Sequence, residues 1–132
     1  MWICPKCERE LKNASQRHYC AKVSIDSLFE GKSAELAFVF DKLLCEIVDW
    51  EDVAVSATPN CIVFVHNQTF LVIRPMRKQL DIKFYSATPQ EDELIVKSVP
   101  WAGKYENHIR VSTLEDVTQA IYTFIRRSYQ LL

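Results

Sequence analysis

The spacing of the apolar residues changes near residue 53, and this change constrains the fold more than any other feature of the sequence. Before it, apolar residues from Leu36 to Val48 recur three and four positions apart, as in an amphipathic helix that begins near Ser33. After it, short β-branched or aromatic runs alternate with turn residues, at 53–56, 61–66, 69–74 and 80–85. Connections this short join only antiparallel neighbours, so the sequence predicts an antiparallel sheet.

The last third of the chain predicts one more hairpin and a second helix. Runs at 94–99 and 105–111 flank a turn at Ala102-Gly103-Lys104. Ser112 and Glu115 have the spacing of a capping box, and apolar residues then recur at helical spacing to Ile125. We therefore expect an α+β domain over residues 23–132, in which an antiparallel β-meander of about six strands packs with two main helices.

The first twenty residues hold a possible metal-binding motif. Cys4-Pro5-Lys6-Cys7 is followed, after ten mostly polar residues, by His18-Tyr19-Cys20. Zn²⁺ takes thiolate sulfur and imidazole nitrogen in closed tetrahedral sites, and a segment with so little core would draw its folding energy from the metal. The motif predicts a structural zinc site with the ligands Cys4, Cys7, His18 and Cys20, in a small knuckle or ribbon over residues 1–22.

The cysteines of this motif could instead form a redox pair or a disulfide. A thioredoxin-like Cys-x-x-Cys follows a strand of a βαβ unit, whereas only Met1-Trp2-Ile3 precede this one. A disulfide favours an oxidising compartment, and the sequence shows no charged and apolar leader for export. We therefore expect a cytoplasmic protein with zinc as its cofactor.

Composition excludes few classes of function. With 132 residues, 48% hydrophobic and 25% charged, the chain has the size and composition of one globular domain. The net charge of −1 gives no overall attraction to nucleic acid or anionic lipid, and no apolar run approaches the length of a membrane helix. Cys45 and Cys61 lie within apolar patterns and are interpreted as buried residues.

A basic cluster is the second candidate site. Its cations are Arg74, Arg77, Lys78 and Lys83, with Lys104 as a possible neighbour across the sheet. If these side chains share one face they form an anion or nucleic-acid patch, with Tyr85, Trp101 or Tyr105 available for stacking. The alternative is a solvated sheet face whose charges discourage aggregation.

Two further patterns suggest chemistry. Asp81 and Lys83 on one strand are similar to the metal-binding half of a restriction-type nuclease motif, which needs another carboxylate, and Glu51 and Asp52 are the upstream candidates. Strand alternation alone also explains these two residues as outward-facing. His66 and His108 flank apolar strands without a recognisable nucleophile, so a surface or capped histidine is the simpler interpretation.

The chain resembles a bacterial domain-of-unknown-function family. The resemblance rests on the Cys4 to Cys20 module, on Leu28-Phe29-Glu30-Gly31-Lys32, on the Arg74 to Lys78 segment, on His108-Ile109-Arg110-Val111 and on the terminal helix. It implies a short zinc module followed by a compact α+β domain. Relatives of that larger domain occur in longer proteins with nuclease or transport-related labels.

The expected function is therefore that of a non-catalytic interaction module. It has a structural zinc site and a protein or nucleic-acid partner, and no membrane association is predicted. The alternative is an enzyme, either a metal-dependent nuclease-like protein or a small-molecule-processing one, that uses the sheet face around Asp81 and Lys83.

Overall fold

The computed structural model describes residues 2–3, 5, 10–11 and 25–132. Two short strands, β1 (Trp2–Ile3) and β2 (Glu10–Leu11), pair antiparallel near the N-terminus. A single turn of 3₁₀ helix, η1 (Asp26–Phe29), follows. Gly31 lies two residues beyond its end, and its φ of 72° suits a residue without a Cβ.

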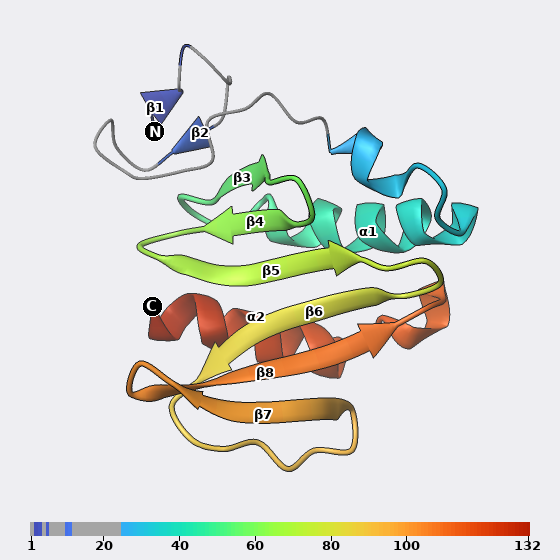
Figure 1. Cartoon of the computed structure of the whole chain (residues 1–132). Coiled ribbons are helices and arrows are strands. Elements are labelled where there is room, and N and C mark those ends of the chain that lie inside the picture. The colour runs from blue at the N-terminus through green and yellow to red at the C-terminus, as the bar shows by residue number, and fades with distance from the viewer. Residues whose placement is uncertain (1, 4, 6–9, 12–24) are drawn as a thin grey trace.

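Six antiparallel strands form the main sheet (Figure 1). They are β3 (Ala54–Ala57), β4 (Ile62–Val65), β5 (Thr69–Pro75), β6 (Leu80–Ser86), β7 (Ile95–Trp101) and β8 (Lys104–Val111), in the spatial order β3-β4-β5-β6-β8-β7. The predicted runs match these strands closely, and the prediction of an α+β fold with six antiparallel strands is confirmed.

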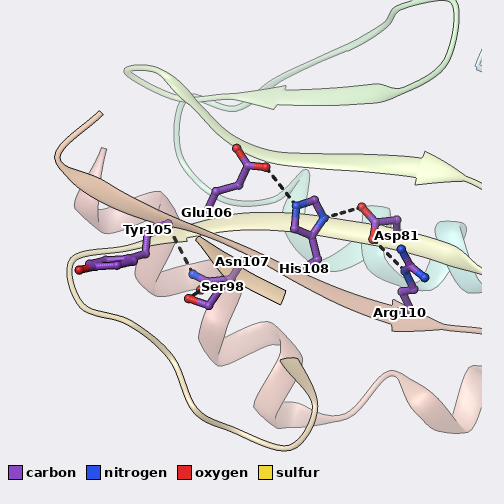
Figure 2. Close-up of polar contacts among 7 residues, drawn as sticks. All are labelled: Asp81, Ser98, Tyr105, Glu106, Asn107, His108 and Arg110. Carbon is purple, nitrogen blue, oxygen red and sulfur yellow. Dashed lines mark hydrogen bonds and ion pairs between the residues drawn. The ribbon is translucent and has the colours of Figure 1, made fainter. Parts of the chain in front are cut away.

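The last hairpin departs from the predicted meander, because β8 and not β7 pairs with β6. The 87–94 segment crosses to the outer edge of the sheet, and a buried polar network anchors that edge. Asn107 is fully buried, donates from Nδ2 to Ser86 Oγ over 2.9 Å, and accepts at Oδ1 from Ser98 Oγ over 2.6 Å. Figure 2 shows the Asn107 and Ser98 side chains together.

Two helices cover one side of this sheet (Figure 1). They are α1 (Ala34–Ile47) and α2 (Gln119–Leu131). The core lies between them and a row of aliphatic side chains that crosses all six strands, formed by Ala57, Ile62, Ile73, Ile82, Ile109 and Ile95. Burial of the α1 stripe confirms the amphipathic helix, since Leu36, Leu43 and Ile47 are fully buried.

The helix predicted from Ser112 begins later than expected. Residues Leu114–Asp116 form a separate 3₁₀ turn, η2, and α2 begins only at Gln119. The capping box joins Thr113 to Asp116 and caps this short turn, so the predicted Ser112–Glu115 box is wrong by one residue. Val117 is extended and buried, which separates the two helical segments.

Both edges of the sheet are protected from further pairing. β2 lies beside β3 at one edge. At the other edge, the register of β7 against β8 shifts between Ile95 and Lys97, and Pro100 supplies no backbone N–H. A partner would therefore bind to a face of the sheet and would not extend it by pairing with an edge strand.

Candidate functional site

The side of the sheet opposite the helices carries a concentration of basic side chains. Strand register places them in rows, because residues directly opposite on paired strands point to the same side. One row contains Arg74, Asp81 and Arg110, and the next contains Val72, Lys83, His108 and Lys97. Farther along follow Tyr85 with Glu106 and then Trp101 with Lys104. We call this surface the basic face and define it by Arg74, Lys83, Lys97, Lys104 and Arg110, together with Tyr85 and Trp101.

The two carboxylates on the basic face are held in one polar network (Figure 2). Asp81 Oδ2 lies 2.8 Å from His108 Nδ1, and Asp81 Oδ1 accepts from Arg110 Nε over 3.3 Å. The other ring nitrogen, His108 Nε2, lies 3.0 Å from Glu106 Oε1. An imidazole can donate to both carboxylates only in its protonated form, so the network holds a cation between two anions when His108 is charged.

The remaining cations of the basic face have no such partners. Within the described part of the chain, no carboxylate oxygen lies within ion-pair distance of Arg74, Lys83, Lys97 or Lys104. Asp81 and Glu106 are already engaged with His108 and Arg110. The surface therefore has an excess of positive charge that its own acidic side chains do not neutralise.

An aromatic pair lies at the hairpin end of the basic face. The rings of Tyr85 and Trp101 are 5.1 Å apart between centroids and inclined by 37°. Tyr85 is buried, and burial followed by the negative charge of Glu106 raises the pKa of its phenol above the ordinary value. Trp101 is 48% exposed, which is unusual for so large an apolar side chain.

The structure brings together part of the predicted patch. Arg74, Lys83 and Lys104 share the basic face, whereas Arg77 and Lys78 lie in the β5–β6 turn at its end. Sequence reasoning missed Lys97 and Arg110, which reach this face through the pairing of β7 and β6 with β8. Their outward alternation within two predicted strands was the signal that could have identified them.

A nuclease site would need a further carboxylate beside Asp81 and Lys83. Neither Glu51 nor Asp52, the candidates from the sequence, contacts Asp81. Asp52 lies in the α1–β3 connection, where its backbone carbonyl is 3.2 Å from His66 Nδ1. Asp81 instead contacts His108 and Arg110 on β8. His66 packs on Tyr129 with a centroid distance of 4.3 Å, as a structural histidine would.

The predicted zinc ligands Cys4, Cys7, His18 and Cys20 lie outside the described residues. Among the residues that the structure does describe, no three His, Cys, Asp or Glu side chains form a group that could hold a metal ion.

In the same part of the chain, Cys45 is exposed on α1 and Cys61 is half-buried, so the expectation that both are buried is wrong for Cys45. No helix there has the length and apolar character of a membrane span.

A groove of about 320 Å³ lies between α1 and α2, on the helix side of the molecule. Its walls include Glu46, Trp50 and Tyr122, and the Arg126 guanidinium lies 4.8 Å from the centroids of both Trp50 and Tyr129. Burial, followed by the nearby charges of Glu46 and Cys45, raises the pKa of the Tyr122 phenol. Arg126 therefore makes cation–π contacts with these two rings, and none of the basic-face residues line the groove.

Comparison with known proteins identifies the family. The model of a family described as a domain of unknown function, DUF5655, matches residues 25–132. The chain therefore belongs to the DUF5655 family, and the match begins after the Cys4 to Cys20 motif. Neither the curated proteins nor the solved structures yielded a match.

Proposed function

We propose that this member of the DUF5655 family is a non-catalytic interaction module that binds nucleic acid through its basic face. The observation that carries the proposal is a set of four cations without described carboxylate partners, on the side of the sheet opposite the helices. They are Arg74, Lys83, Lys97 and Lys104. Phosphate groups are the ligands that such a surface would attract most strongly.

The low net charge does not oppose this proposal, because many of the acidic side chains belong to elements other than the strands of the basic face. Acidic side chains gather on α1 and on the segment after it, and these are Glu35, Asp41, Glu46, Asp49, Glu51 and Asp52. A second acidic group, Glu91, Asp92 and Glu93, lies in the 87–94 segment. A ligand close to the basic face therefore meets a local field that differs from the average over the chain.

We further propose a structural zinc ion at Cys4, Cys7, His18 and Cys20, which would fold the N-terminal segment. Three thiolates and one imidazole form a closed ligand set, so the ion would have no position for substrate. Cysteines remain reduced and able to bind metal in a reducing compartment, and this requirement supports a cytoplasmic location.

A salt titration of binding tests the nucleic-acid proposal. A labelled oligonucleotide should bind the protein at low ionic strength, and its association constant should fall steeply as salt rises, because bound counterions are released from the phosphates. The double variant Arg74→Ala, Lys83→Ala should bind at least tenfold more weakly and show a shallower salt dependence.

The matched control removes two positive charges from the other side of the sheet. Lys42→Ala with Arg126→Ala, whose side chains contact η2 and the rings of Trp50 and Tyr129 on the helix side, changes the net charge equally and should leave binding within about twofold of the parent protein. Equal losses in both double variants would indicate a nonspecific charge effect. Absent binding to nucleic acid, with capture of an acidic protein by the same face, would replace the proposal by a protein-binding role.

A further inference from the structure

The exposed indole of Trp101 lies where the basic face ends at the β7–β8 hairpin. A two-residue turn, with φ of 46° at Ala102 and 80° at Gly103, makes Trp101 and Lys104 direct cross-strand neighbours. A flat aromatic surface is therefore fixed beside a cation that has no carboxylate partner in the described part of the chain. This pairing suits a nucleotide, because the base can stack on the indole and the phosphate can pair with the lysine.

Tyr85 supports the indole from the sheet. It is only 5% exposed, and its backbone N–H donates to Ser128 Oγ of α2 over 2.9 Å. Trp101 packs on this fixed ring and still exposes about half of its own surface. The indole is thus held in place before any ligand arrives, which lowers the entropy cost of stacking a base on it.

The arrangement of the cations suits an extended strand better than a duplex. From Arg110 to Lys104, β8 extends about 20 Å at the usual rise per residue, and Lys83 and Lys97 lie near its middle. The side chains form a grid on a sheet, while both helices lie on the opposite side and cannot enter a groove from this face. Unstacked bases can lie flat on such a surface, but bases within a duplex cannot.

We propose that the basic face binds single-stranded nucleic acid, with one base stacked on Trp101 and the phosphates along Lys104, Lys97 and Lys83. The inference rests on the proposed function and specifies its ligand. Stacking would give an affinity that depends little on sequence, because every base has a π-face.

Fluorescence anisotropy with a short labelled oligothymidine, alone and annealed to its complement, tests the inference. The single strand should bind about tenfold more tightly than the duplex. Trp101→Ala should weaken single-strand binding by about tenfold and leave duplex binding unchanged, whereas Trp101→Phe should retain most of the affinity. Trp50→Phe, which changes a tryptophan on the helix side, serves as the matched control and should bind like the parent protein.

The outcomes separate the two proposals. Equal affinity for single strand and duplex, with no effect of Trp101→Ala, would overturn the stacking inference and leave the proposed function intact. Failure of both ligands to bind at low salt would overturn the proposed function itself. Far-ultraviolet circular dichroism of each variant verifies the fold, and the exposed position of Trp101 predicts near-parental spectra.

Discussion

At the scale of single residues, Ser128 is the link between the terminal helix and the sheet. Its hydroxyl accepts from the Tyr85 N–H over 2.9 Å and donates to the Phe70 carbonyl over 2.7 Å. The described pairing of β5 with β6 ends at Leu71 and Phe84, so the hydroxyl bridges the two strands where their own ladder stops. The serine also fixes the backbone of Tyr85, on which Trp101 packs.

Ser128→Ala should reduce the free energy of unfolding by about 2–3 kcal/mol, because it leaves a buried N–H and a buried carbonyl without partners. Thr123→Ala in the same helix is the control, since that hydroxyl only donates to the Gln119 carbonyl of the preceding turn. It should change stability by less than about 0.5 kcal/mol. Urea unfolding of the three proteins measures the difference, and equal stabilities of both variants would contradict the bridging role.

At the scale of elements, the segment before α2 shows why local patterns predict its start wrongly. Lys42 Nζ of α1 donates to the carbonyls of Leu114 and Val117 over 3.2 and 3.4 Å. These contacts hold the chain in η2 and in the extended residue that follows. The capping-box spacing cannot reveal these contacts, because Lys42 lies more than seventy residues upstream.

The Asp116 carboxylate caps η2 and should make stability depend on pH. Backbone hydrogen bonds from Ser112 and Thr113, 2.8 and 3.0 Å long, lower the pKa of Asp116 below its ordinary value. A group with a lowered folded-state pKa stabilises the protein above the pKa of the unfolded chain. That stabilisation is lost as the pH falls through the folded-state pKa.

Asp116→Ala should therefore cost up to about 1 kcal/mol at neutral pH, a value limited by the solvent exposure of the carboxylate. The difference from the parent protein should shrink as the pH falls below about 4. Glu115→Ala, which removes a neighbouring carboxylate of the same turn, should show no comparable trend. Thermal unfolding across the acid range gives the comparison, and a difference independent of pH would refute the capping role.

The position of each strand can be predicted from its own residues, whereas the order of the strands in the sheet depends on contacts between distant segments. Alternation within each segment predicts the six strands to within two or three residues of their observed ends. The exchange of β7 and β8 depends on how the 87–94 segment crosses the sheet and on the Asn107 network. For the same reason, the sequence predicts that Lys83 faces outward, but it does not predict that Lys83 and Lys97 lie on either side of His108 in the same row.

At the scale of the whole molecule, we propose that the protein has two regions with different sources of stability. The described core is built from two helices and six strands and buries its own apolar face. The N-terminal motif, with ten mostly polar residues between its ligand pairs, depends in our proposal on a metal ion. The family match covers residues 25–132, and the division itself stays a prediction.

Cys7→Ser should abolish metal binding, and the α+β core should keep its unfolding transition. Elemental mass spectrometry should find about one zinc ion per parent chain and none in the variant. Cys45→Ser, which removes an exposed thiol of α1, is the matched control and should retain the metal. Global unfolding of Cys7→Ser would disprove the two-region description, and a metal-free parent protein would disprove the zinc site.

The basic face is the proposed binding surface, and nuclear magnetic resonance tests this assignment most directly. Titration of isotope-labelled protein with single-stranded oligonucleotide should shift the backbone amides of β5, β6, β7 and β8, together with the Trp101 indole N–H. The amides of α1 should remain unchanged, because that helix lies on the opposite side of the sheet. Shifts confined to the groove between α1 and α2, or no shifts at low salt, would show that the basic face is not the binding surface.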